Sequence, residues 1–277
     1  MKIALIGYGY WGKILYNNLK SFDIDLVVCD AVSSDYPVTI TNYRDISDVK
    51  SVIVAVPCKD HYDICKHFLK KGISVFCEKP LTFTLQESIE LYEIAEKNNT
   101  VLFVDWIFLY NTQVNKIKDI VNSMELGKLI SVNMRRLNKG PARHDVNSLY
   151  DLSSHDFSIL FHILGSERIT TLFSQSYKMN KLSIQNDSFS GLYDINNVLC
   201  SIQSSWQYPI KDRCCFFEFE KGIIQWDDTI QSLKINGIDW ISEKNISPLL
   251  TSIGSFLYNV LRENEKKLTL KIMEIIQ

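Results

Sequence analysis

Apolar and polar positions divide the chain into two halves with different periodicity. In residues 1–112, short apolar runs alternate with segments of helical pattern. The runs are "KIALIG", "DLVVCD", "SVIVAV", "ISVFCE" and "TVLFVD". Continuous apolar strands separated by helices are typical of a parallel sheet covered on both faces. The first half is therefore predicted to be an α/β domain.

Two helices of this half carry end signals. The segment "HYDICKHFLKKG" ends at Gly72 after two lysines, which suits a glycine C-cap and the negative end of the helix dipole. The next helix opens with Thr84 and Glu87 in the spacing of a capping box.

Residues 113–277 show long segments of period two, which predict strands with one buried face. In "LISVNMRRLN" the apolar residues Ile130, Val132 and Met134 alternate with polar ones, and "NVLCSIQSSW" follows the same pattern. In "CCFFEFEKGIIQW", Lys221 and Gly222 are placed for a hairpin turn. An α+β domain with an open, mainly antiparallel sheet is expected, with a short C-terminus whose last helix could pack back on the first domain.

Composition narrows the class of protein. The chain has 277 residues, of which 46% are hydrophobic and 22% charged, with a formal net charge of −2. Scattered, balanced charges give no surface for nucleic acid or an anionic membrane. The apolar runs are too short for a signal peptide or a membrane span, and "MKIALIGYGYWG" is interpreted as a strand and turn.

The seven cysteines are odd in number and lie mostly in apolar runs, without zinc spacing, so no metal site is predicted. A reducing cytoplasm fits this pattern best. The adjacent Cys214 and Cys215 are expected to be a core and a surface thiol on opposite faces of a strand.

The stretch "IGYGYWGK" carries the first candidate chemistry. Gly7, Gly9 and Gly12 form G-x-G-x-x-G between an apolar strand and a helix, where backbone amides can approach a pyrophosphate. Asp30 ends the second strand, 18 residues after Gly12, where a carboxylate can bind the ribose diol and repel a 2′-phosphate. NAD is therefore favoured over NADP, and a glycine-rich turn followed by an unrelated surface aspartate is the alternative.

Later motifs lie at the ends of the next strands. "VAVPCKDH" contains Val56, Pro57 and His61, and "CEKP" places Glu78 and Lys79 after the fifth strand. Ligands of open α/β sheets bind outside the carboxyl ends of the strands, so Lys79 is expected at the mouth of the crevice.

The order of these motifs, followed by "FLYN" and "DLSSHDFSILFHILG", resembles the Gfo/Idh/MocA family of glucose-fructose oxidoreductase and inositol dehydrogenase relatives. Its members join a Rossmann domain, here residues 1–112, to an α/β domain for substrate binding and oligomerisation, here 113–277. The resemblance implies an NAD-dependent dehydrogenase or reductase acting on a hydroxyl or keto carbon of a sugar, nucleotide sugar or polyol. The run "GPARHDVNSLYDLSSHD" further resembles a branch linked to surface glycans and sugar nucleotides.

The resemblance also implies roles for particular residues. Lys79, Asp151 and His155 would be catalytic, with Lys79 binding the reacting oxygen and His155 exchanging its proton, an assistance worth roughly 10²–10⁴ in rate. Which of the two takes the proton stays open, and a solvated lysine and a structural histidine are the alternatives. The cofactor would contact Gly7, Tyr8, Gly9, Tyr10, Trp11, Gly12, Asp30, Val56, Pro57, His61, Glu78 and Lys79.

Substrate residues are expected in and after "RRLNKGPARHDVN". Arg143, Asn147, Asp151, His155 and Lys79 would bind substrate, and the basic residues Arg135, Arg136, Lys139, Arg143 and His144 would suit a carboxylate or diphosphate. A solvated loop is the alternative. The chain departs from the family at Ser153 and Ser158 and ends early for it.

Two other functions remain open at this stage. Some relatives use NAD transiently to hydrolyse glycosides, and a non-catalytic NAD-binding protein would keep the same fold. The family resemblance further implies a homodimer or homotetramer formed through the sheet of the second domain.

Overall fold

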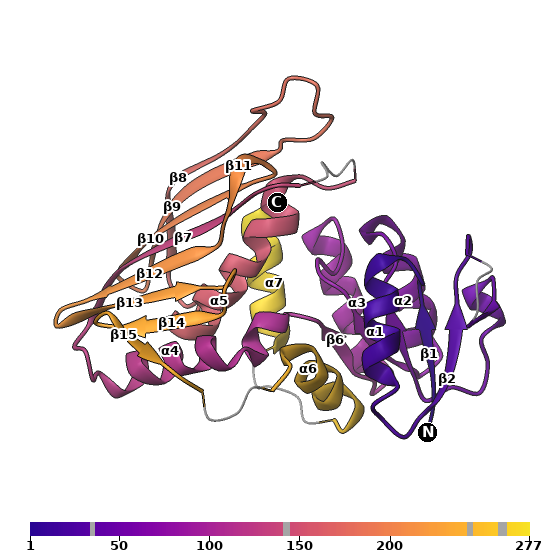
Figure 1. The fold of residues 1–277 in the computed structure, drawn as a ribbon. Coiled ribbons are helices and arrows are strands. Elements are labelled where there is room, and N and C mark those ends of the chain that lie inside the picture. Colours follow the sequence, from indigo (N-terminus) through magenta and orange to yellow (C-terminus); the bar gives the residue numbers. More distant parts are fainter. Residues whose placement is uncertain (34–36, 141–144, 243–245, 260–264) are drawn as a thin grey trace. The chain divides into compact units, whose positions relative to one another are not determined.

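A computed structural model describes residues 1–277 except 34–36, 141–144, 243–245 and 260–264 (Figure 1). The chain divides into two units. The first comprises Met1–Ile107, Leu249–Ile275 and Gln277, and the second comprises Phe108–Pro248 and Ile276. From the sequence, the division was expected after residue 112, and the last helix was expected to be able to pack back on the first domain. The segment that belongs to the first unit is longer than that helix and comprises Leu249–Ile275.

The first unit is built on a parallel six-stranded sheet in the order β3-β2-β1-β4-β5-β6. Its strands are β1 Lys2–Ile6, β2 Asp25–Cys29, β3 Val38–Ile40, β4 Ser51–Val54, β5 Ser74–Cys77 and β6 Leu102–Val104. Its helices are α1 Tyr10–Leu19, α2 His61–Lys70, α3 Leu85–Lys97, α6 Pro248–Leu257 and α7 Glu265–Ile276, with short 3₁₀ turns at Tyr43–Asp45 and Cys58–Asp60. The apolar runs form the sheet because helices bury both of its faces.

The predicted helix ends are confirmed. α2 is followed by Gly72 in the left-handed region (φ +74°), which glycine adopts without steric cost. Thr84 accepts a hydrogen bond from the Glu87 amide, and the Glu87 carboxylate accepts one from the Thr84 amide, which completes the capping box of α3.

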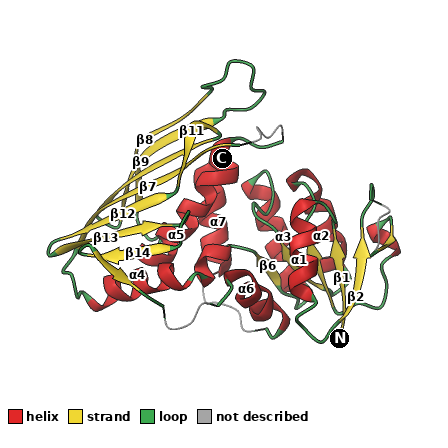
Figure 2. Cartoon of the chain, viewed as in Figure 1, coloured by secondary structure: helices red, strands yellow, loops and turns green. Residues whose placement is uncertain are grey.

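The second unit holds a nine-stranded sheet with helices on one face, drawn in yellow and red in Figure 2. The path is β15-β14-β13-β12-β7-β10-β9-β8, and β11 pairs with β7. Its strands are β7 Leu129–Lys139, β8 Ile169–Tyr177, β9 Ser188–Ile195, β10 Val198–Ser205, β11 Gln207–Asp212, β12 Cys214–Phe219, β13 Gly222–Asp227, β14 Ser232–Ile235 and β15 Ile238–Trp240. Its helices are the 3₁₀ turn Ile107–Tyr110, α4 Thr112–Ser123, the π-helical segment Leu149–Ser153 and α5 Ser154–Leu164.

The sheet is mainly antiparallel, as predicted, but β7 and β10 run parallel. Three local expectations were wrong. Phe219 pairs with Gly222, so the hairpin turn is Glu220–Lys221 rather than Lys221–Gly222. Cys214 and Cys215 are both buried, and the Gln225 side chain of the neighbouring strand β13 lies 3.6 Å from the Cys214 sulfur. Ile130 is 47% exposed, although Val132 and Met134 are core residues.

Candidate active site

The glycine loop between β1 and α1 is shaped by close backbone packing. Gly7 has a φ of +98°, and a Cβ there would lie 2.5 Å from the Ala55 carbonyl oxygen. A Cβ on Gly12 would lie 2.1 Å from the Gly7 oxygen. A Cβ on Gly9, by contrast, would meet no atom within 4 Å. Gly7 and Gly12 therefore allow strand and helix to pack, while the space beside Gly9 suits the approach of a phosphate at the start of α1.

Asp30, at the end of β2, holds this loop together. One carboxylate oxygen accepts a hydrogen bond from the Tyr8 amide (2.6 Å), and the other accepts from the amides of Val32 (2.8 Å) and Ser33 (2.7 Å). Partial burial alone would raise the pKa of Asp30, but these backbone bonds outweigh it and lower the pKa below its usual value. A carboxylate accepts about four hydrogen bonds, and the residues that the structure describes supply three, which leaves a position for a ribose hydroxyl as far as those residues go.

A cavity of about 360 Å³ opens beside Asp30. Its lining includes Gly7, Asp30 and Val56, together with Tyr43 and Arg44 from the turn after β3. The Arg44 guanidinium lies over the Tyr43 ring, 4.5 Å from its centroid. The cavity fits the adenosine half of a dinucleotide in three respects. Its volume is suitable, the flat groups of Tyr43 and Arg44 can stack on a base, and Asp30 can accept hydrogen bonds from a ribose diol.

His61, at the start of α2, joins two strand ends. Its Nδ1 lies 3.0 Å from the Pro80 carbonyl oxygen and its Nε2 lies 2.9 Å from that of Val56. Burial lowers the pKa of His61, so the ring is neutral at pH 7 and donates from one nitrogen only. Both ring nitrogens face the backbone, which makes His61 a group that holds the Val56–Pro57 turn against the turn at Pro80.

Lys79 follows β5 in the first unit, with the Lys79–Pro80 bond in the cis form. Glu78 accepts a hydrogen bond from the Trp11 indole, which links the strand end to α1. Tyr8 packs edge-on against Tyr16, whereas Tyr10 is 84% exposed at the first position of α1. The first unit thus brings together the glycine loop, Asp30, Val56, Pro57, Glu78 and Lys79 along the carboxyl ends of its strands.

Asp151 and His155 lie in the second unit, on one continuous helical stretch. The predicted early helix start is present, but Asp151 belongs to the π-helical segment and His155 to α5. The Asn147 side chain accepts a hydrogen bond from the Tyr150 amide (2.9 Å), so this predicted substrate residue also caps the helix. π-helical turns are rare and occur frequently at functional sites.

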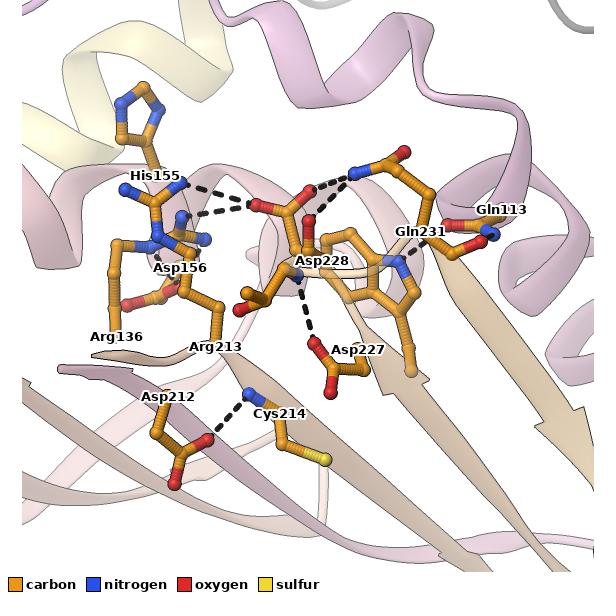
Figure 3. Close-up of polar contacts among 12 residues, drawn as sticks. Gln113, Arg136, His155, Asp156, Asp212, Arg213, Cys214, Asp227, Asp228 and Gln231 are labelled. Carbon is orange, nitrogen blue, oxygen red and sulfur yellow. Dashed lines mark hydrogen bonds and ion pairs between the residues drawn. The ribbon is translucent and has the colours of Figure 1, made fainter. Parts of the chain in front are cut away.

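A network of charged side chains lies near His155 (Figure 3). Phe108 packs edge-on against the His155 ring at 5.2 Å, and the Arg136 guanidinium lies 4.7 Å from the Phe108 centroid. Arg136 donates two hydrogen bonds to Asp156 (2.9 and 2.8 Å) and lies 3.9 Å from Asp228. Arg136 and Asp156 are both fully buried.

This network corrects one expectation from the sequence. Arg136 is not available to bind a substrate anion, because Asp156 occupies its guanidinium. Arg135 forms an ion pair with Asp212 at 3.2 Å on the other face of β7. Arg143 and His144, also predicted to meet substrate, lie outside the described residues.

Sequence reasoning missed Asp105, which follows β6 and is 1% exposed. Burial raises the pKa of Asp105 to about 7, although a hydrogen bond from Ser252 and the charge of Lys79 both oppose this. Burial also raises the pKa of Glu78, and the charge of Asp105 adds to the effect. The apolar run "TVLFVD" ends in an acid, as "DLVVCD" does, which is the one signal that could have indicated it.

The described residues show neither a metal site nor a membrane-spanning helix. No group of three His, Cys, Asp or Glu side chains suited to a metal ion was found among them. In the same part of the chain, no helix is long and apolar enough to cross a bilayer.

Comparison with known proteins matches the first part of the chain to an oxidoreductase family. Residues 1–106 match the GFO_IDH_MocA model, described as the oxidoreductase family with NAD-binding Rossmann fold. The uncharacterized oxidoreductase YrbE of Bacillus subtilis is 27% identical over 170 residues, covering 58% of this chain and 48% of that protein. Inositol 2-dehydrogenase of Salmonella typhimurium is 24% identical over 187 residues, covering 60% and 55% respectively. The chain thus spans about half the length of these curated relatives.

Solved structures share the fold across both units. The WlbA dehydrogenase of Bordetella pertussis, solved with NADH and UDP-GlcNAcA, has a TM-score of 0.84 at 14% identity, covering 100% of this chain and 94% of that one. KijD10, a 3-ketoreductase of Actinomadura kijaniata solved with TDP-benzene and NADP, has a TM-score of 0.86 at 14% identity, with 100% and 95% coverage. Residues 1–106 thus match the NAD-binding Rossmann-fold domain of the Gfo/Idh/MocA oxidoreductase family, and the fold of the chain resembles those of solved oxidoreductases.

Proposed function

We propose that the protein is an NAD-dependent dehydrogenase or reductase that acts on a hydroxyl or keto carbon of a sugar, nucleotide sugar or related polyol. The observation that carries this proposal is the set of groups at the strand ends of the first unit. A dinucleotide loop, a carboxylate bonded to that loop and a lysine next to buried carboxyls lie along one sheet edge. A non-catalytic NAD-binding protein would need the first two, but not the third.

The residues of the first unit fit a dinucleotide. The space beside Gly9 would take the pyrophosphate, Asp30 the adenosine ribose, and the cavity beside Tyr43 and Arg44 the adenine. NAD, when bound, supplies the acceptor or donor of hydride. NAD is favoured over NADP because the cavity lining also includes Asp60 and Asp63, whose charges would repel a 2′-phosphate together with that of Asp30.

The remaining chemistry falls to Lys79, Asp151 and His155. The Lys79 ammonium would hydrogen-bond the reacting oxygen and stabilise its developing negative charge. His155 would exchange the hydroxyl proton, with Asp151 one π-helical turn away to orient the imidazole. Asn147 would bind substrate as well as cap this helix, and Arg143 stays a predicted substrate residue.

The substrate class is proposed from the relatives' names. Those matched by sequence include inositol 2-dehydrogenases, and those matched by fold include a UDP-N-acetylglucosamine 3-dehydrogenase of Acidithiobacillus ferrooxidans and the ketoreductase solved with TDP-benzene. A nucleotide-linked sugar as substrate would agree with the resemblance of the segment before α5 to a branch of the family linked to surface glycans and sugar nucleotides. Free cyclitols are the next class to test.

The test is a screen of nucleotide sugars, free sugars and inositols with purified protein and NAD or NADH, following absorbance of the reduced nicotinamide. We expect that one class of compound causes NADH to form or to be consumed in a one-to-one ratio with the compound converted. Lys79→Ala should lower kcat by on the order of 10³ with nearly unchanged affinity for NAD, and His155→Asn by about 10² with an altered pH profile. Release of free sugar without net NADH change would instead show a glycosidase, and a Lys79→Ala variant with full turnover would refute the role of Lys79.

We also propose that the protein forms a homodimer or homotetramer through the helix-free face of the nine-stranded sheet. Phe173, Leu199 and Ile223 on this face are 49%, 46% and 45% exposed. Between them lie hydrogen-bonded polar pairs such as Asn133 with Ser201 (2.8 Å). Apolar residues mixed with satisfied polar groups are typical of an interface between subunits.

A further inference from the structure

Asp105 and Glu78 occupy equivalent positions after neighbouring strands. β5 and β6 are parallel, with Cys77 opposite Val104, so the next residue of each strand leaves the sheet at the same edge. The Asp105 amide donates to the Cys77 carbonyl oxygen (2.9 Å), which continues the ladder by one residue. Two carboxyl groups are thus placed side by side, and Lys79 follows directly on one of them.

The contacts of the Asp105 carboxyl point to a defined role. Oδ1 accepts a hydrogen bond from Ser252 Oγ of α6 at 2.5 Å. Oδ2 is buried and has no hydrogen-bond partner among the residues that the structure describes. The charge of Lys79 acts on both Asp105 and Glu78, and Glu78 is held in turn by the Trp11 indole. A buried carboxylate oxygen without a hydrogen bond is costly unless a nearby cation compensates it.

The C-terminal segment holds the end of β6 at three successive residues. Glu265 accepts from the Val104 amide (3.3 Å), Ser252 donates to Asp105, and Thr269 accepts from the Trp106 indole (2.9 Å). β6 is the edge of the sheet, so its amides have no further strand to bond. Residues about 150 positions away in the sequence therefore fix the direction of the Asp105 side chain.

The two carboxyls cannot both ionise cheaply. Burial raises the pKa of Asp105 to about 7 and that of Glu78 as well, and the charge of Asp105 further disfavours ionisation of Glu78. Around neutral pH the pair therefore retains at least one proton, and Asp105 is a carboxyl that ionises in this range. The titratable groups that face it are Lys79 after β5 and, one residue earlier on β6, Glu265 of α7.

We propose that Asp105, oriented by Ser252, is a positioning residue that supplies the counter-charge for the Lys79 ammonium, so that the C-terminal helices take part in building the reaction centre of the first unit. This rests on the proposed role of Lys79. In this proposal Asp105 touches neither cofactor nor substrate, but it determines the charge beside Lys79, which does.

The test compares three variants of the full chain. Asp105→Asn keeps the shape and the Ser252 bond but removes the charge, and Ser252→Ala removes the orienting donor. Thr269→Val is the matched control, because it deletes the neighbouring hydrogen bond to Trp106 from the same C-terminal segment without touching the carboxyls. Acetylation of Lys79 by acetic anhydride at pH 7.5, followed by mass spectrometry of its peptide, reports how readily the ammonium gives up its proton.

We expect Asp105→Asn to raise the acetylation rate of Lys79 on the order of tenfold, since the ammonium loses its counter-charge. Ser252→Ala should change it in the same direction, and Thr269→Val by less than about twofold. The pH profile of kcat should lose its limb near 7 in Asp105→Asn but not in Thr269→Val. Unchanged acetylation in both Asp105→Asn and Ser252→Ala would overturn the proposal. Acetylation needs no turnover, so a protein inactive on every sugar would refute the proposed function while this result still decided the role of Asp105.

Discussion

Asp30 has a structural role in the loop and a proposed role in cofactor binding. Among the described residues, its carboxylate accepts three backbone hydrogen bonds, one from Tyr8 of the glycine loop and two from the turn after β2, and in the proposed function it also binds a ribose hydroxyl. The bonds to Tyr8, Val32 and Ser33 pre-orient the carboxylate before any cofactor binds. A substitution here should therefore affect stability as well as cofactor choice.

We predict that Asp30→Asn weakens NAD binding more than NADP binding, because it removes an acceptor for the ribose diol and a charge that repels a 2′-phosphate. The lowered pKa of Asp30 stabilises the fold above pH 4, and this contribution is lost as pH falls through the folded-state pKa. The variant should therefore be less stable at pH 7 and show a shallower loss of stability in acid. Fluorescence titration with both cofactors and urea unfolding at pH 3–7 measure the two effects.

Asp63→Asn is the control, since Asp63 lines the same cavity from α2. It removes one negative charge without removing the bonds to the loop. An Asp30→Asn variant with the wild-type ratio of NAD to NADP affinities would contradict the ribose role. If Asp30→Asn changed the stability no more than Asp63→Asn does, this would contradict the structural role of Asp30.

Strand β7 and helix α5 are joined by a buried ion pair rather than by apolar contacts alone. Val132, Met134 and Arg136 alternate on the same face of β7, so the strand period places a guanidinium in the core. Asp156 of α5 receives it through two hydrogen bonds. The pair fixes the position of α5, and with it that of His155, because separating a buried charge from its partner is costly.

We predict that Arg136→Met lowers the free energy of unfolding by about 3–5 kcal/mol, because it removes the cation that is hydrogen-bonded to the buried Asp156. The double variant Arg136→Met with Asp156→Leu should recover most of this loss, since the penalty belongs to the unpaired charge. Urea denaturation measures both.

Arg135→Met provides the comparison on the same strand. The ion pair of Arg135 with Asp212 is partly exposed, at 36% and 22%, so its loss should cost less than about 1 kcal/mol. An Arg136→Met variant as stable as Arg135→Met would show that the buried pair does not hold α5 to the sheet.

The division of the chain into two units separates the predicted tasks. Residues that fit a dinucleotide lie in the first unit, and the helix with Asp151 and His155 lies in the second. The second unit buries one face of its sheet under α4 and α5 and leaves the other without helices (Figure 2). That face carries Phe173, Leu199 and Ile223, which supports the proposed contact between subunits.

We predict that the wild-type protein is a dimer or tetramer by light scattering and that Leu199→Asp shifts it to smaller species, because a charge would be buried at the interface. Met124→Asp is the control, since Met124 is 50% exposed at the end of α4 and away from this face. A monomeric wild type would contradict the proposal, and so would an equal effect of the two substitutions.

Several features were readable from the sequence because they rest on local rules. The glycine spacing, Asp30, the capping box at Thr84 and the alternation of β10 each involve residues close together in the chain. Misjudged features depend on distant partners. Cys214 is buried and receives a hydrogen bond from the Gln225 side chain, 11 residues later, and Arg136 is in the core, where Asp156, 20 residues later, accepts its hydrogen bonds.

The α/β and α+β halves and the dinucleotide loop followed from the sequence alone, since hydrophobic periodicity and short motifs act over a few residues. The resemblance to a family supplied the candidate residues Lys79, Asp151 and His155. Only the tertiary structure revealed that the segment returning to the first unit begins at Leu249 and that Ser252 bonds Asp105 where the charge of Lys79 acts on it. The physical reason is that burial and electrostatic coupling depend on which distant groups share a low-dielectric site, and no local pattern specifies that.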